Sequence, residues 1–355
     1  MYWAKRLIIS LFSIILLILL LNGACALGER LAYGAFWGKE SPEGLYIHKN
    51  GERLRLKANV ELNGWLYQVS VNSLGFRGMD LEVPKPTGSF RVWCMGGSTT
   101  FDIFSDSDAN TWPAQTEAML SEQFPNQKIE VLNAGIPGDV LLDSRENFLK
   151  YKKELKIDAV VIYHGPNDLS QLLSAPQQQN AHQANQIEIA DNASPFDFIL
   201  EREDIASVRV LRKMLTESIP NQPEWESNQM TQKQLNEMQN RLEQTIRLVK
   251  KHHATPILAT HALKAKDGDT GSLAKERVGE TTSLLRMTPE RSIETIHYYN
   301  QMVKALALKY HIPVADIRSV VGSEDDNWGD GTHFKPKGST LAAQEVARAI
   351  AELID

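Results

Sequence analysis

The sequence predicts an α/β protein of the flavodoxin-like kind, a three-layer α/β/α sandwich around a central parallel sheet of about five strands. Two observations carry this prediction. From residue 90 onward, short apolar segments alternate with longer amphipathic ones, as strands alternate with helices. The segment 158–163 is apolar on both faces, which is typical of a strand buried inside a parallel sheet. Before this domain we expect a transmembrane or signal helix and a small β-rich segment.

The individual elements follow from the same alternation. The expected strands lie at residues 90–95, 129–132, 158–163, 256–260 and 313–315. The expected helices lie at residues 112–124, 140–155, 231–252, 292–310 and 338–354. Pro113 stands at the first turn of its helix, where proline is tolerated.

Two insertions, 170–228 and 263–291, interrupt the alternation of the main domain. The first is rich in Gln and Asn, and the second is charged and contains Gly. Both follow points where strands should end, so each is expected to form either a lid or substrate rim, or a solvated insertion without a catalytic role.

The composition of residues 1–28 predicts a segment that is directed to the membrane. Lys5 and Arg6 precede an uncharged, mostly apolar run, and a helix over 7–27 would be about 31 Å long, close to a bilayer core. The cations favour an N-in, single-pass anchor in the cell membrane with the rest of the chain exported. Alternatively, a signal peptidase cuts after Ala26 in the pattern Ala24-Cys25-Ala26, and the chain is secreted.

Residues 29–88 are expected to form a small β-rich segment and linker, and residues 89–355 the main domain. Short alternating stretches at 54–56 and 64–71, with the turn Asn50-Gly51, predict strands and hairpins. The stretch 84–88, which contains two prolines and a glycine, reads as the linker.

Composition narrows the classes of function. The 355 residues carry a net charge of −6 and no basic stripe, so nucleic acid is not an expected partner. The two cysteines, Cys25 and Cys94, cannot build a disulfide scaffold and belong to no metal-binding cluster. We expect neither a metal nor another cofactor. The oligomeric state stays open.

Four polar motifs are candidates for a functional site. Three follow predicted strands directly, and the fourth lies in the loop before the last predicted helix. They are Gly96-Gly97-Ser98-Thr99-Thr100, Asn133–Asp139, His164–Asp168 and Asp330-Gly331-Thr332-His333. Each alone is an ordinary turn or cap. Because the carboxyl ends of parallel strands meet at one edge of a sheet, the four motifs are expected to meet at one site.

The residue types in these motifs predict nucleophilic catalysis. The Ser98 hydroxyl needs an adjacent base, for which His333 is the candidate, and Asp330 can orient that imidazole from the same loop. An oxyanion is expected to be held by the backbone N–H groups at Ser98 and Gly138 and by the Asn167 amide.

This constellation resembles the SGNH (GDSL-like) hydrolase superfamily over roughly residues 90–355. Ser98 matches the nucleophile of its first block, Gly138 and Asn167 the oxyanion residues of the next two, and Asp330 and His333 the final D-x-x-H block. The resemblance implies an ester hydrolase without a cofactor.

One residue departs from the family pattern. Gly97 stands where the Gly-Asp-Ser form has aspartate, which points to a membrane-anchored subgroup with Gly-Gly-Ser-Thr-Thr. The α/β-hydrolase elbow G-x-S-x-G is disfavoured, because Thr100 replaces its last glycine.

Further residues are candidates for the substrate pocket: Thr99, Asp139, His164 and Arg77. Arg77, in the stretch Asn72–Arg77, either shapes the substrate entrance or pairs with a carboxylate of the main domain in a structural turn. His164 and His261 follow strands, and either line the pocket or are satisfied structural histidines.

Three aspartates follow the predicted nucleophile, namely Asp102, Asp106 and Asp108. Their spacing lacks the rest of a calcium-binding loop, so we expect a solvated loop there.

The sequence therefore favours a serine esterase that hydrolyses carboxylic, most readily O-acetyl, esters of envelope or extracellular polysaccharide. An O-acyltransferase to carbohydrate would use the same residues with a sugar hydroxyl in place of water. A non-catalytic binding module with this fold is the third alternative. The expected partners are an ester substrate, such as an acylated carbohydrate, and the membrane through the N-terminal helix.

Overall fold

The computed structural model describes residues 2–33, 45–47, 55–174 and 229–354. Five parallel strands form the central sheet of these residues: β5 (Phe90–Gly96), β6 (Ile129–Gly135), β7 (Ala159–Tyr163), β8 (Thr255–Ala259) and β9 (Val314–Ala315). Their order across the sheet is β6-β5-β7-β8-β9. This is the flavodoxin-like order, in which the second strand lies outside the first. The predicted fold class is confirmed.

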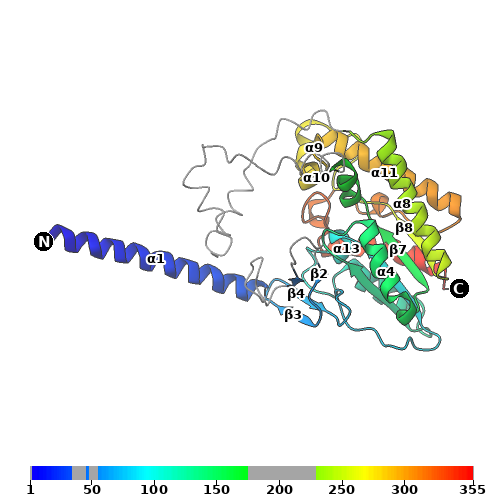
Figure 1. Cartoon of the computed structure of the whole chain (residues 1–355), viewed down its shortest axis with the longest axis horizontal. Coiled ribbons are helices and arrows are strands. Elements are labelled where there is room, and N and C mark those ends of the chain that lie inside the picture. The colour runs from blue at the N-terminus through cyan, green and yellow to red at the C-terminus, as the bar shows by residue number, and fades with distance from the viewer. Residues whose placement is uncertain (1, 34–44, 48–54, 175–228, 355) are drawn as a thin grey trace, which may run out of the picture.

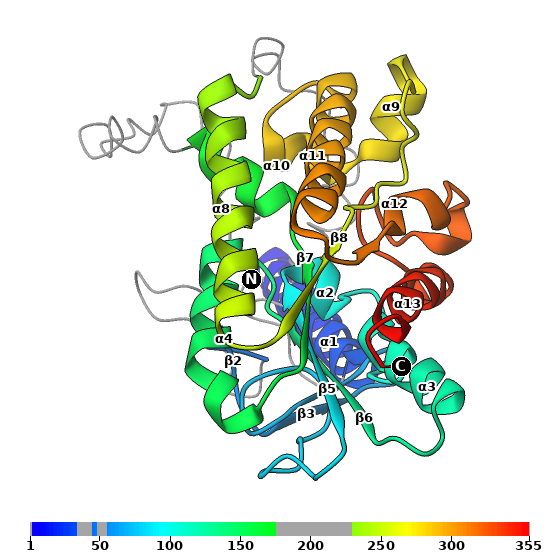
Figure 2. The same cartoon turned by 90° about the vertical axis from the view of Figure 1, so that its right-hand side faces the viewer.

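Helices cover both faces of the sheet, as Figure 2 shows. One face packs against α3 (Trp112–Gln123) and α13 (Pro336–Ala351), and the other against α4 (Leu141–Leu155), α8 (Gln232–Lys251) and α11 (Pro289–Tyr310). The alternation within β5 decides which side chains face which layer. Val92 and Cys94 belong to the core under α3 and α13, and Trp93 and Met95 to the core under α4 and α8.

The N-terminal β-rich segment shares the core of the main domain. Phe76 packs edge-on against Trp93 of β5 with ring centroids 5.1 Å apart, and Trp93 packs edge-on against Phe148 of α4 at 6.0 Å. Such aromatic pairs each add about 0.5–1.5 kcal/mol beyond the area they bury. This contact fixes the segment against the sheet.

Two short antiparallel pairs make up that segment. β1 (Tyr46–Ile47) pairs with β2 (Arg55–Leu56), and β3 (Val60–Asn63) forms a hairpin with β4 (Gln68–Val71). The expected strand over 64–71 is wrong in its first half, because residues 64–67 form the hairpin turn and the partner strand is β3. The predicted turn Asn50-Gly51 lies outside the described residues.

The N-terminal helix α1 (Tyr2–Tyr33) projects away from the sheet and meets the rest of the chain near β3 and β4 (Figure 1). Its segment Ile9–Ala32 is long and apolar enough to cross a membrane, and none of its most apolar window is buried. An uncleaved anchor and a cleaved signal sequence both fit this helix.

The second insertion folds into two short helices, α9 (Gly271–Val278) and α10 (Glu280–Leu285). Of the first insertion, a helix over 166–174 is described and residues 175–228 lie outside the described residues. The prediction of a lid there stays a prediction. The remaining short elements are α2 (Ser98–Phe101), α12 (Ile317–Val320) and a 3₁₀ turn over Asp325–Asn327.

Candidate active site

The turn between β5 and α2 positions Ser98 at the carboxyl edge of the sheet. Gly96 ends β5, and a Cβ there would lie 1.9 Å from Thr100 Oγ1 and 2.6 Å from the Tyr163 carbonyl oxygen. Only glycine permits this close approach. Ser98 is then the first residue of α2, and the Phe101 N–H closes the turn onto the Gly97 carbonyl at 2.9 Å.

A chain of hydrogen bonds joins the three predicted catalytic residues. Ser98 Oγ lies 2.8 Å from His333 Nε2, and His333 Nδ1 lies 2.7 Å from Asp330 Oδ2. This places a hydroxyl, an imidazole and a carboxylate in the order that lets the imidazole accept the hydroxyl proton. The chain joins residues 235 positions apart in the sequence.

The Asp330 carboxylate is held ionised by its surroundings. Partial burial acts to raise the pKa of Asp330. The hydrogen bonds from His333 and from the backbone N–H groups of Thr332 and His333 lower it by more, so the pKa lies below its ordinary value. Both N–H groups donate to Oδ1 at 2.8 Å. The carboxylate therefore fixes the loop and the imidazole at the same time.

A small pocket of about 50 Å³ opens beside Ser98 Oγ. Its lining residues come from the ends of β5, β7 and β8, from α10 and from the loop before α13. They are Gly97, Ser98, Thr99, Tyr163, His164, Gly165, Pro166, Asn167, His261, Leu284, Thr332 and His333. Of the four predicted pocket residues, Thr99 and His164 line it, whereas Asp139 and Arg77 do not.

The two other predicted oxyanion residues lie next to this turn. Residues 136–139 form a turn in which the Asp139 N–H donates to the Ile136 carbonyl at 3.0 Å, and Gly138 has a φ of +85°. Proline at position 137 and glycine at 138 suit a type II turn. Asn167 Nδ2 donates to the Asp139 carbonyl at 3.1 Å. The buried side chain of Asp139 accepts instead from Asn147.

Gly97, the departure from the family pattern, has a spatial reason in this chain. A Cβ at position 97 would lie 2.9 Å from Asn167 Nδ2 and 3.3 Å from the Asp139 carbonyl oxygen. The missing side chain leaves room for the amide that is predicted to hold the oxyanion.

We therefore expect Gly97→Ala to lower kcat by about 10²-fold, because the new methyl group displaces the Asn167 amide. The measurement is steady-state hydrolysis of p-nitrophenyl acetate. Asn167→Ala serves as the matched variant, and the double variant should be no slower than either single one, since both remove the same donor. Additive losses in the double variant would contradict this explanation.

Two further histidines support the site. His261 is buried, stacks on Tyr163 with ring centroids 5.3 Å apart, and places Nε2 2.8 Å from Thr332 Oγ1. Burial lowers its pKa to about 3, so the ring is neutral at physiological pH. His164 contacts Asp168 at 3.1 Å and Ser144 at 3.0 Å. His164 has a partner for each ring nitrogen and also lies at the pocket wall, so the two alternatives of the sequence analysis combine there. His261 lines the pocket as well, but its Nδ1 has no hydrogen-bond partner among the described residues.

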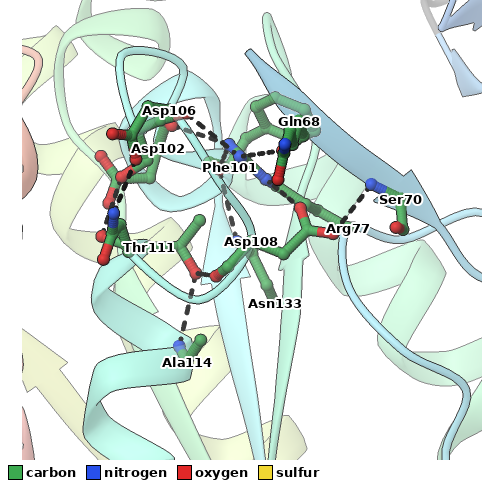
Figure 3. Close-up of polar contacts among 12 residues, drawn as sticks. Gln68, Ser70, Arg77, Phe101, Asp102, Asp106, Asp108, Thr111, Ala114 and Asn133 are labelled. Carbon is green, nitrogen blue, oxygen red and sulfur yellow. Dashed lines mark hydrogen bonds and ion pairs between the residues drawn. The ribbon is translucent and has the colours of Figure 1, made fainter. Parts of the chain in front are cut away.

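Arg77 anchors the loop that follows α2 (Figure 3). Its Nε donates to Asp108 Oδ1 at 2.8 Å, and its Nη atoms donate to the carbonyl oxygens of Phe101, Asp102 and Ser105 at 2.9–3.2 Å. The Arg77 guanidinium is buried. The Arg77 backbone pairs with that of Val71 in β4 and with that of Asn133 in β6. These contacts match the structural alternative, in which Arg77 pairs with a carboxylate of the main domain.

The expectation that Asp102 lies in a solvated loop is wrong. Asp102 is buried, with a φ of +66°, and Oδ2 accepts from the Trp112 N–H at 2.9 Å and from Ser339 Oγ at 2.7 Å. Burial raises the pKa of this carboxyl to about 6, against the lowering effect of those hydrogen bonds and of the nearby Arg77. The residue joins the end of α2 to α3 and α13, and its partner Ser339 is 237 positions away.

We expect Asp102→Asn to flatten the pH dependence of stability. The folded-state pKa of about 6 exceeds the ordinary 3.8, so the folded chain binds this proton more tightly than the unfolded chain. The free energy of unfolding therefore falls as the pH rises from about 4 to about 6, by about 3 kcal/mol. Asparagine tolerates the positive φ and keeps an acceptor oxygen.

Urea unfolding at pH 4.5 and pH 7.5 measures this difference for both chains in detergent. The variant should be the more stable chain at pH 7.5. An identical fall in the free energy of unfolding for the two chains would contradict the assigned role of Asp102.

Sequence reasoning missed two side chains near the site. The Phe104 ring lies 5.9 Å from the His333 ring and is 44% exposed. Leu284 of α10 lines the pocket, and its carbonyl accepts from Ser170 Oγ at 2.8 Å. The second insertion thus contributes to the pocket wall. The sequence signal for Phe104 was an aromatic residue shortly after the predicted nucleophile.

A comparison with known families assigns the chain. The sequence pattern of the GDSL-like lipase/acylhydrolase family matches residues 94–341, which include Ser98 and His333. The chain belongs to this family. It is therefore placed among ester-hydrolysing enzymes, as the resemblance of the motifs predicted. No curated protein matches the sequence.

Three similar solved structures are distant from this chain in sequence. An α/β-hydrolase enzyme from the metagenome of Lake Arreo has a TM-score of 0.45 at 12% identity, and covers 74% of this chain and 96% of its own. An acetyl-xylooligosaccharide esterase from Geobacillus has a TM-score of 0.43 at 16% identity, and the match covers 74% of this chain and 95% of the esterase. The lipase/acylhydrolase from Enterococcus faecalis has a TM-score of 0.42 at 17% identity, and the match covers 74% of this chain and 96% of that protein.

Proposed function

We propose that this acylhydrolase is a serine esterase that removes small acyl groups, O-acetyl above all, from carbohydrate outside the cytoplasm. The observation that carries the proposal is the unbroken hydrogen-bonded chain from Ser98 Oγ through His333 to Asp330, at 2.8 and 2.7 Å, beside a small pocket. Each role below is part of this proposal.

In the first half of the reaction the enzyme is acylated. Ser98 Oγ attacks the ester carbonyl carbon as its proton passes to His333 Nε2. Asp330 keeps the imidazole in the correct tautomer and stabilises the imidazolium. The tetrahedral intermediate then collapses, the bond from carbon to the alcohol oxygen breaks, and the proton on Nε2 passes to the departing alcohol.

The oxyanion of the intermediate is stabilised by N–H groups at the two turns. The Ser98 N–H lies at the start of α2, the Gly138 N–H lies in the neighbouring turn, and Asn167 supplies its amide. Donors aimed at a developing negative charge contribute the largest single part of many rate accelerations.

In the second half the acyl group leaves. A water molecule attacks the acyl-Ser98 carbonyl while His333 Nε2 takes its proton. The carboxylic acid departs as Ser98 Oγ recovers the proton from Nε2. A sugar hydroxyl in the place of water would transfer the acyl group, which is the O-acyltransferase alternative.

The size of the pocket favours a small acyl group. Its volume of about 50 Å³ holds on the order of three to five water-sized groups, since each needs about 10–15 Å³. An acetyl group has three heavy atoms, whereas a fatty acyl chain exceeds this space. Leu284 and the ring of Tyr163 give the pocket apolar walls.

The proposed location rests on α1. A helix with an apolar segment over Ile9–Ala32, preceded by Lys5 and Arg6, supports an N-in anchor with the sheet domain on the exported side. Acylated polysaccharides of the envelope are then the esters within reach.

The first experiment labels the full chain, purified in detergent, with a fluorophosphonate probe. We expect one labelled peptide that contains Ser98 and no labelling in Ser98→Ala. A folded wild-type chain without label, checked by near-ultraviolet circular dichroism, would argue for the non-catalytic binding module.

The second experiment separates hydrolysis from transfer and tests the acyl group. Acetyl, butyryl and octanoyl p-nitrophenyl esters are compared, and acetylated xylan is incubated with and without an acceptor oligosaccharide. The proposal predicts acetyl > butyryl > octanoyl in kcat/KM and free acetate as the product. Acetylated acceptor as the main product would establish the acyltransferase instead.

A further inference from the structure

The turn of the β3–β4 hairpin carries two adjacent apolar side chains that the described chain leaves mostly exposed. Trp65 is 86% exposed and Leu66 is 59% exposed. Buried positions on the same hairpin are occupied in the usual way, because Leu62 and Val69 face the core. The exposure is therefore confined to the turn, and a large aromatic side chain in water is costly.

This turn lies against the end of α1. The Trp65 N–H donates to the Leu31 carbonyl and the Leu66 N–H to the Ala32 carbonyl, each at 2.7 Å. The last carbonyls of a helix have no partner within it, so the hairpin supplies donors to two of them and is fastened to the end of α1. Figure 1 shows β3 and β4 beside the end of α1.

The position along α1 sets the depth of the turn. The uncharged run of α1 ends at Gly28, and Glu29 and Arg30 follow it. Ala32 lies about 6 Å beyond Gly28 along the helix axis. The headgroup region of a bilayer is about 5–8 Å thick on each side, and tryptophan concentrates there. The turn thus falls at headgroup depth.

We propose that the β3–β4 turn is a second membrane contact of this protein, with Trp65 and Leu66 inserted in the headgroup layer where α1 leaves the bilayer. The partner is the lipid surface itself. The inference rests on α1 being an uncleaved anchor, as proposed above, and is independent of the catalytic chemistry.

The contact would fix the sheet domain, because the base of the hairpin is fastened beside the active site. The Gln68 N–H donates to the Asp106 carbonyl at 2.7 Å, and the Ser70 N–H to Asp108 Oδ2 at 2.8 Å. Arg77 joins the same Asp108 to the end of α2 (Figure 3). The hairpin, the loop 102–111 and the nucleophile turn therefore form one continuous unit. The membrane contact sets the orientation of Ser98 toward the surface on which the protein is anchored.

The test places the environment-sensitive fluorophore NBD on the turn of the full chain in phosphatidylcholine vesicles. Leu66→Cys is labelled in a Cys25→Ser background, since Cys94 is completely buried and unreactive in the folded chain. Leu308→Cys on α11 is the matched control, because Leu308 is an equally apolar side chain, 76% exposed. Near-ultraviolet circular dichroism confirms that both labelled chains are folded, and neither readout depends on enzymatic activity.

We expect blue-shifted emission at position 66 and strong quenching by vesicles of brominated phosphatidylcholine, with water-like emission and little quenching at position 308. Equal, water-like behaviour at the two positions in chains that float with the vesicles would overturn the proposal. Failure of the full chain to float would overturn it as well, because α1 then anchors nothing.

Discussion

Replacing Ser98 with alanine is expected to lower kcat/KM for p-nitrophenyl acetate by about 10⁴–10⁶-fold. In the proposed mechanism the acyl-enzyme forms on the hydroxyl that lies 2.8 Å from His333 Nε2. Without it, only the oxyanion donors and substrate binding remain. KM should change little, because the Ser98 side chain contributes little to ground-state binding.

The partners of Ser98 should behave as a unit with it. Asp330→Asn is expected to cost about 10⁴-fold in kcat, because the amide favours the wrong imidazole tautomer. The double variant of Ser98→Ala and His333→Ala should be no slower than Ser98→Ala alone.

A matched serine supplies the control for this prediction. Ser319 is exposed on α12, and its hydroxyl donates only to the Asp316 carbonyl. Ser319→Ala should keep the wild-type rate. More than one per cent residual activity in Ser98→Ala would show that another group starts the reaction.

The sheet and the edge at which the site lies could be predicted from sequence because both depend on local patterns. Short apolar runs such as 158–163, which alternate with longer amphipathic segments, indicate buried strands, and parallel strands place their carboxyl ends together. The strand ends therefore brought Ser98, Asn167 and the 136–139 turn together, before any contact was known. His333 joined them because the last loop before α13 returns to the same edge.

The burial of individual polar side chains could not be predicted in this way. Asp102 stands in an Asp-rich stretch of the loop after α2, and nothing local distinguishes it from its exposed neighbour Asp106. Its burial depends on Ser339 and on the amide of Trp112, which the fold brings from α13 and α3. Leu284 likewise reached the pocket only because α10 packs over it. Contacts between residues so far apart in the sequence produce no periodic pattern from which the burial could be predicted.

Arg77→Met is expected to destabilise the folded chain by about 3–5 kcal/mol, because the hydrogen bonds of a buried cation to Asp108 and to three carbonyl oxygens are lost, and bonds to a charged group contribute about 1.5–3 kcal/mol each. The Arg77 side chain is 1% exposed and that of Asp108 is 27% exposed. Methionine fills a similar volume but leaves the carbonyl oxygen of Ser105 without a donor and that of Phe101 with only the Asn133 amide. Arg77→Lys should lose less stability than Arg77→Met, because its ammonium group retains the charge. It should still be less stable than the wild type, because it lacks the planar fork of donors.

The loss should be measured as the free energy of urea unfolding in detergent, followed by tryptophan fluorescence. Arg247→Met is the matched control, since the Arg247 side chain is 68% exposed and its partner Glu243 keeps a second cation in Lys309, so its loss should change stability little. Because Arg77 fastens both the hairpin and the end of α2, its replacement is expected to reduce kcat at temperatures where the chain is still folded. A fully stable Arg77→Met chain would mean that the backbone bonds of Gln68 and Ser70 to the loop 102–111 hold the hairpin and that this loop needs no cation to hold its shape.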